Sequence, residues 1–125
     1  MKIKLAFLFY GKYELLFNLL YTVYLLEFKS MHIIIWEYTV KPEREEEFVK
    51  LYNSKGDWDR LFKKSNDYIN TIFLKQVDTP FQYTTIDKWK TKEAYELFLD
   101  KYKLEYAKLD QQGGSLTVSE NRLTL

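Results

Sequence analysis

The stretch FQYTTIDKWKTKEAYELF, residues 81–98, contains the change of pattern that decides the fold. Every second residue of its first half shares one face: Tyr83, Thr85, Asp87 and Trp89. This alternation is typical of a half-buried β-strand. Its second half begins at Thr91, a residue type that caps helices, and continues with the apolar spacing of a helix face. The stretch therefore predicts a strand over residues 81–89 that leads directly into a helix.

The sequence before this stretch predicts two more strands and another helix. HIIIWEYTV (32–40) is rich in β-branched and aromatic residues and is about the length of a strand. It ends just before Pro42, which suits the first turn of a helix. The apolar spacing of that helix continues to Phe62, with a break expected at Gly56. YINTIFLKQV (68–77) predicts a strand that is joined to the next one by a hairpin-length connection.

The end of the chain completes the order of elements. The helix that begins at Thr91 keeps apolar residues at steps of three or four up to Leu109, and Gly113 and Gly114 are expected to end it. SLTVSENRLTL (115–125) alternates loosely and predicts a last strand. The order β-α-β-β-α-β predicts an α+β, ferredoxin-like split fold. In this fold one four-stranded antiparallel sheet carries both helical segments on the same face.

The other face of the predicted sheet has no cover within the chain. The strand 32–40 is apolar on both faces, with Ile33 and Ile35 on one and Ile34 and Trp36 on the other. Large exposed apolar surfaces are uncommon on monomers and mark interaction sites. We therefore expect two copies of the chain to pair sheet to sheet as a homodimer.

The composition excludes several kinds of site and partner. Nineteen Lys and Arg against 18 Asp and Glu give a formal charge of +1, which offers no electrostatic reason to expect a nucleic-acid partner. The chain has no cysteine, which excludes a thiol nucleophile and a thiolate metal site and suits a reducing, cytoplasmic location. Its single histidine, His32, excludes a site built from two histidines of one chain, and no metal site is predicted.

Residues 1–30 differ from the rest and are separated from the functional domain, residues 31–125. They are rich in leucine and aromatic residues, but the longest charge-free run, Leu15 to Leu26, is shorter than the roughly 20 apolar residues of a membrane span. Three interpretations stay open: an extension or upstream start artefact before Met31, a helix over about residues 13–28 that docks on the domain, and a helix that contacts a membrane surface.

Five pieces of the sequence between Met31 and about Arg122 together resemble one known superfamily. They are WEYTVKPEREEEF, GDWDRLF, YTTIDKWKTKEAYELF, EYAKLD and LTVSE. In this order they resemble the antibiotic biosynthesis monooxygenases. The resemblance implies a dimeric α/β-barrel with a pocket between the sheet and the helices of each subunit. It also implies an oxygenase that uses O₂ on a phenolic or quinol-type substrate, so that no cofactor is expected.

A second branch of the same superfamily degrades haem and is disfavoured here. It uses an Asn on the first strand, a Trp at the end of the third strand and a His on the last helix. Trp89 matches that Trp, but the corresponding position on the first strand is Trp36. The helix from Thr91 to Gln112 contains no histidine.

An aromatic pocket is the candidate site that the sequence predicts. Asp87 is the candidate base, because a phenolate or carbanion is what lets O₂ react without a cofactor. Trp89, the other candidate catalytic residue, and Tyr83 would position the substrate ring, and Tyr106 would donate a hydrogen bond to a substrate oxygen. The expected substrate-binding residues are Trp36, Trp58, Tyr83, Tyr102 and Tyr106.

Two alternatives to this interpretation stay open. In the first, Asp87 has a structural role and accepts a hydrogen bond from an indole N–H or from the backbone at the helix start. In the second, the chain is a non-catalytic dimeric module that binds a small ligand or serves in assembly. An aromatic stripe at helical spacing is also the ordinary pattern of a hydrophobic core.

Overall fold

The computed structural model describes residues 13–124, except for the side chain of Phe28. Residues 1–12 of the predicted extension and Leu125 of the predicted last strand lie outside the described residues. The chain divides into two compact units between Ser30 and Met31. The first contains helix α2 (Glu14–Ser30). In the described part of the chain, no helix has both the length and the apolar character needed to cross a membrane.

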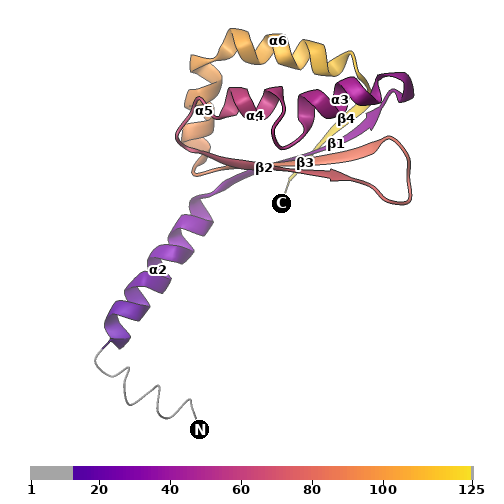
Figure 1. The fold of residues 1–125 in the computed structure, drawn as a ribbon. Coiled ribbons are helices and arrows are strands. Elements are labelled where there is room, and N and C mark those ends of the chain that lie inside the picture. Colours follow the sequence, from indigo (N-terminus) through magenta and orange to yellow (C-terminus); the bar gives the residue numbers. More distant parts are fainter. Residues whose placement is uncertain (1–12, 125) are drawn as a thin grey trace. The chain divides into compact units, whose positions relative to one another are not determined.

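The second unit is built on one four-stranded antiparallel sheet. Its strands are β1 (His32–Val40), β2 (Tyr68–Lys75), β3 (Gln82–Trp89) and β4 (Thr117–Leu123). They lie in the order β2-β3-β1-β4, so that the first and third strands of the sequence are the central pair (Figure 1). The predicted α+β, ferredoxin-like fold is confirmed.

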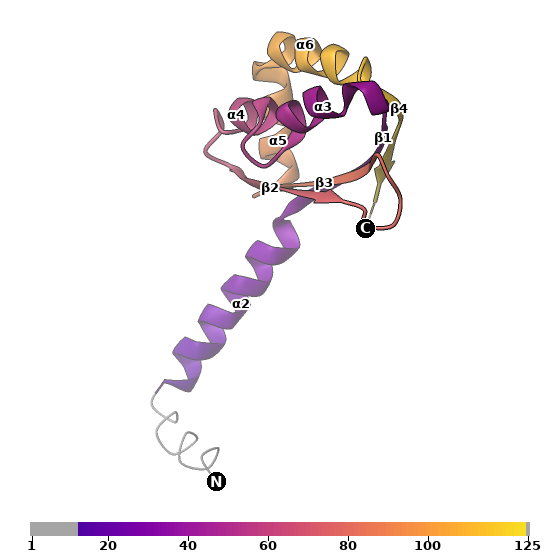
Figure 2. The same ribbon diagram turned by 45° about the vertical axis from the view of Figure 1, so that its right-hand side comes forward.

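The helical segments of this unit all lie on one face of the sheet (Figures 1 and 2). They are η1 (Pro42–Arg44), α3 (Glu45–Tyr52), α4 (Asp57–Phe62), α5 (Lys92–Lys101) and α6 (Lys103–Gly114). The predicted break at Gly56 is confirmed, since α3 ends before it and α4 begins after it. A Cβ atom at Gly56 would overlap the Leu51 carbonyl oxygen, so the turn between the two helices requires glycine.

The predicted long helix after Thr91 is instead two helices. The Thr91 side chain caps α5 as expected, accepting a hydrogen bond from the Ala94 N–H at 3.1 Å. The backbone leaves the helical conformation at Tyr102, with φ −110° and ψ 32°, and α6 continues in a new direction. Gly113 and Gly114 were expected to stop the helix, but both lie in the last turn of α6. A Cβ atom at Gly113 would overlap the Tyr52 hydroxyl, so this glycine makes room for a side chain of α3.

The inner face of the sheet packs against the helices through large side chains. Trp89, Phe48, Leu51, Leu116 and Val40 are the largest fully buried residues. Every second residue of β3 is buried, as the alternation predicted. The outer face carries a row of apolar residues across all four strands, because the registers pair neighbours in this order: Ile72, Ile86, Ile35 and Leu123.

Candidate functional site

Asp87 lies in the middle of the inner face of the sheet. The strand registers place it between Ile34 of β1 and Thr71 of β2. The residue is only 9% exposed, and its Oδ1 accepts a hydrogen bond from Thr71 Oγ1 at 2.6 Å. Burial raises the pKa of Asp87 to about 6, and the Thr71 hydrogen bond offsets part of that rise. Asp87 is therefore a carboxyl group that changes charge close to neutral pH.

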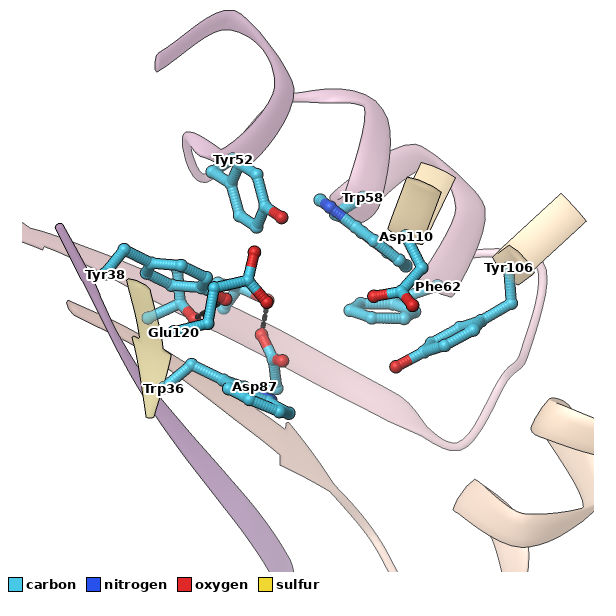
Figure 3. Close-up of a pocket in the computed structure, with 11 residues that line it drawn as sticks. Trp36, Tyr38, Tyr52, Trp58, Phe62, Asp87, Tyr106, Asp110 and Glu120 are labelled. Carbon is cyan, nitrogen blue, oxygen red and sulfur yellow. Dashed lines mark hydrogen bonds between the residues drawn. The ribbon is translucent and has the colours of Figure 1, made fainter. Parts of the chain in front are cut away.

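A small cavity adjoins Asp87 between the sheet and the helices (Figure 3). Its volume is about 40 Å³, enough for water-sized molecules. Ligand pockets in proteins are usually larger, about 300 Å³ or more. The residues that line the cavity come from four strands and three helices: Trp36, Tyr38, Tyr52, Trp58, Phe62, Thr71, Thr85, Asp87, Tyr106, Asp110 and Glu120.

Three carboxyl groups line this cavity, and no lysine or arginine of the described residues does. Besides Asp87 they are Asp110 of α6 and Glu120 of β4. Glu120 Oε1 accepts a hydrogen bond from Thr117 Oγ1 at 3.1 Å, and burial raises the pKa of Glu120. None of the ion pairs found in the described part of the chain involves these three groups. Within residues 13–124, no group of three or more acidic or histidine side chains is arranged to hold a metal ion.

Hydrogen-bond donors also line the cavity. The Trp58 indole nitrogen is buried, makes no hydrogen bond of full geometry within the described residues, and points toward the Tyr52 hydroxyl, with which it interacts as a donor (Figure 3). The Tyr38 hydroxyl and Thr85 Oγ1 form a hydrogen bond at 3.1 Å. Burial raises the pKa values of Tyr38, Tyr52 and Tyr106 above the usual range, so these hydroxyls stay protonated at neutral pH. The cavity thus combines a carboxylate that can accept a proton with neutral N–H and O–H donors.

The cavity brings together four of the residues that the sequence singled out: Trp36, Trp58, Asp87 and Tyr106. The other three lie elsewhere. Tyr83 is buried between the rings of Phe48 and Phe73, with ring centroids 5.1 and 5.2 Å away.

Tyr102 lies beside a different surface hollow, near Lys64 and Lys101. Trp89 is fully buried against Phe62 and Phe98, with ring centroids 5.4 and 5.0 Å away. It packs in the core and does not line the cavity.

The partners named for Asp87 in the structural alternative are not the observed ones. The Trp89 indole nitrogen has no hydrogen-bond partner among the described residues, so it does not donate to Asp87. The start of α5 is capped by Thr91. Asp87 instead accepts from Thr71, which sequence reasoning did not consider, since only the register of β2 against β3 places the two side by side.

Sequence reasoning also missed several cavity residues: Tyr38, Tyr52, Phe62, Asp110 and Glu120. Glu120 lies on the inner face because its register partner on β1 is Tyr38, and this register is known only from the structure. The side chains from α3 and α6 come close to it only through helix packing, which no local pattern reports.

The chain is similar to solved structures of an oxygenase and of candidate monooxygenases. A single-residue variant of SnoaB, a cofactor-independent oxygenase from Streptomyces nogalater, aligns with a TM-score of 0.64 and 14% identity, covering 77% of this chain and 93% of that one. A candidate antibiotic biosynthesis monooxygenase from Nitrosomonas europaea aligns with a TM-score of 0.59 and 12% identity, covering 75% and 86%. Another, from Bacteroides thetaiotaomicron, aligns with a TM-score of 0.60 and 10% identity, covering 78% and 89%.

The sequence comparisons add no nearer relative. No protein-family model matches this sequence, and no curated protein sequence matches it. Identities of this size are evidence for the fold, while function depends on the residues of the site. The resemblance seen in the sequence is confirmed at that level: the chain has the fold of the antibiotic biosynthesis monooxygenases.

Proposed function

We propose that this protein is a monooxygenase-like enzyme that oxidises a small phenolic or quinol-type substrate with O₂ and without a cofactor. Asp87 is its general base. The observation that carries the proposal is the pairing of groups in one cavity: a buried carboxyl with a pKa of about 6 and the buried indole N–H of Trp58 beside neutral tyrosine hydroxyls. A base with this pKa is mostly ionised at neutral pH and still accepts a proton readily.

The chemistry follows from these two groups. Asp87 takes a proton from the substrate, and the resulting phenolate or carbanion supplies the electrons that reduce O₂. One oxygen atom enters the product as a carbonyl group, and the other leaves as water, so a CH₂ group and O₂ give C=O and H₂O. Trp58 and the neutral tyrosine hydroxyls donate hydrogen bonds to the substrate oxygen.

The cavity has to open for a substrate ring to enter. Its volume of about 40 Å³ accommodates O₂ or water and excludes a planar ring. Trp36 and Tyr106 line it and are only partly buried, so their side chains have room to rotate outward. We propose that these two residues form the entrance, with Tyr106 donating a hydrogen bond to a substrate oxygen.

We further propose that the working unit is a homodimer formed through the outer face of the sheet. This face carries the row Ile72, Ile86, Ile35 and Leu123. Leu123 is 40% exposed, and the three isoleucines are partly exposed. A contiguous apolar row of this kind is normally covered by another protein surface. A second copy of the chain offers a matching apolar row.

The alternative is a non-catalytic dimeric module that binds a small ligand or serves in assembly. The small volume of the cavity favours it, because a site that is already shaped for a planar substrate would be larger.

Oxygen consumption by the protein of residues 1–125 distinguishes the two functions. The substrates are small phenols, hydroquinones and anthrones, each measured with and without a metal chelator. We expect uptake above the uncatalysed rate that the chelator leaves unchanged and that Asp87→Asn lowers by about 100-fold or more. Asp100→Asn, an exposed carboxyl on α5 outside the cavity, is the matched control. Saturable binding of a phenol without oxygen uptake would favour the alternative.

A further inference from the structure

A continuous chain of hydrogen bonds connects Asp87 with a second buried carboxyl group, Asp59 of α4. Thr71 Oγ1 lies 2.6 Å from Asp87 Oδ1 and 2.7 Å from the Tyr68 hydroxyl. The Tyr68 hydroxyl donates to Asp59 Oδ1 at 2.8 Å. Three contacts therefore join two carboxyl groups through two hydroxyl groups.

The chain is shielded from water along its length and ends at the surface. Asp59, Tyr68, Thr71 and Asp87 are 3%, 8%, 8% and 9% exposed. The second oxygen of Asp59 lies 2.7 Å from the Nζ atom of Lys63, whose side chain is 63% exposed. One end of the chain thus borders the cavity, and the other end pairs with a lysine in contact with solvent.

Counting protons shows that this chain is incomplete when both carboxyl groups are ionised. Each hydroxyl group has one proton, and an ionised carboxylate has none. Two protons then serve three contacts, and the Tyr68 and Thr71 oxygens face each other at 2.7 Å without a proton between them if each donates to its carboxylate. A third proton completes the chain: Asp87 donates to Thr71, Thr71 to Tyr68, and Tyr68 to Asp59.

We infer that Asp87, Thr71, Tyr68 and Asp59 form a proton relay between the cavity and the surface at Lys63. The completed chain has a second arrangement with the same number of protons. Asp87 passes its proton to Thr71, Thr71 passes its own to Tyr68, and Tyr68 passes its own to Asp59. One O–H bond breaks and one forms at each hydroxyl group, and the net change is one proton moved from Asp87 to Asp59. The transfer leaves Asp87 ionised, and loss of the proton from Asp59 to solvent at the Lys63 end restores the state in which both carboxyl groups are ionised.

The relay rests on the proposed function for its use, because it exports the proton that Asp87 takes from the substrate. The shared proton itself is a property of the protein without substrate. It also gives a role to the buried hydrogen bond between Thr71, which lines the cavity, and Tyr68, which does not.

Other titratable groups lie near Asp87, and changing any of them would also change its titration. Glu120 of β4 and Asp110 and Tyr106 of α6 line the same cavity. Tyr38 of β1 and Tyr52 of α3 line it as well, and Tyr95 of α5 interacts electrostatically with Asp87. The variants of the test therefore change only members of the relay.

Nuclear magnetic resonance of the substrate-free protein tests the shared proton by following the carboxyl carbon of Asp87 with pH. Tyr68→Phe leaves the Thr71 contact to Asp87 in place and removes the oxygen that the completed chain needs. We therefore expect it to lower the midpoint of the Asp87 titration by about one pH unit. Asp59→Asn replaces the charged acceptor of the Tyr68 proton by a neutral amide whose NH₂ group donates to Tyr68 instead, so that Tyr68 donates to Thr71 and the Asp87 midpoint falls as well. Thr71→Val removes the donor to ionised Asp87 and raises the midpoint.

Tyr83→Phe is the matched control, since it removes a hydroxyl group from the inner face of the same strand at a residue that does not line the cavity. It leaves the Asp87 midpoint unchanged. In the unmodified protein, the Tyr68 ring carbon next to the hydroxyl group shifts at the same midpoint as Asp87, a readout that needs no variant. An Asp87 midpoint unaffected by Tyr68→Phe and Asp59→Asn, or a Tyr68 carbon without that inflection, overturns the relay.

Turnover separates failure of the relay from failure of the proposed function. If no phenol or quinol is oxidised but the titrations behave as described, the proton chain stands and the proposed reaction does not. If oxidation occurs and depends on Asp87, but substitutions at Tyr68 and Asp59 leave the Asp87 titration midpoint unchanged, Asp87 exchanges its proton directly through the cavity.

Discussion

Replacing Asp87 by Asn is expected to stabilise the protein at alkaline pH while it removes activity. Burial raises the pKa of Asp87 from 3.8 to about 6, so the folded state holds this proton more tightly than the unfolded chain does. The contribution to the free energy of unfolding is therefore favourable at low pH and is lost as pH rises from about 4 to about 6. Two pKa units correspond to about 3 kcal/mol.

The variant removes this cost because asparagine has no charge to bury. Its Oδ1 atom still accepts the hydrogen bond from Thr71, but its NH₂ group lacks an assured partner, which costs about 1 kcal/mol. The expected balance is a gain of about 2 kcal/mol at about pH 8 and a loss of about 1 kcal/mol at about pH 4.

Urea denaturation at both pH values measures this difference directly. Asp100→Asn is the control, and its exposed side chain predicts a change within about 0.5 kcal/mol at either pH. A loss of stability in Asp87→Asn that is the same at both pH values would refute the reasoning, because it would show that the carboxyl group is not destabilised by burial.

Three further perturbations test the packing and the assembly. Gly113→Ala places a Cβ atom against the Tyr52 hydroxyl and is expected to lower the free energy of unfolding by about 1–3 kcal/mol in urea denaturation. An unchanged stability would contradict this and would mean that Tyr52 moves aside. Thr91→Ala removes the cap of α5 and lowers stability by about 1 kcal/mol, whereas Thr91→Ser retains it; equal stabilities would contradict the capping role. Ile86→Lys puts a charge in the middle of the outer face and is expected to convert a dimer to monomers in sedimentation, and an unchanged mass would exclude this face as the interface.

The sequence was sufficient for the fold because local patterns and tertiary packing agree in the strands. The alternation of Tyr83, Thr85, Asp87 and Trp89 predicted one buried face, and all four are buried. Where packing dominates, the local pattern was misleading. The apolar spacing of the last helix continues through Tyr102, yet the chain turns there.

Glycine at position 113 is a residue type that commonly ends helices, but here it leaves room for the Tyr52 side chain of α3. No local pattern distinguishes these two uses of glycine.

The candidate site was only partly predictable for a related reason. The inner face of β3 identified Asp87, but the partner of Asp87 depends on the register that sets Thr71 beside it. The link from Tyr68 to Asp59 depends on how α4 packs on β2. Aromatic residues look alike in sequence whether they fill the core, as Trp89 does, or border a cavity, as Trp58 does.

The pH dependence of oxygen uptake tests the central claim, that one buried carboxylate drives the reaction. With a phenolic substrate, the account predicts that kcat/KM rises with pH to a plateau, with a midpoint at about 6, where Asp87 loses its proton. Asp87→Asn should remove both the rise and most of the rate. A rate that is independent of pH between about 5 and 8, or one that Asp87→Asn leaves intact, would contradict the account.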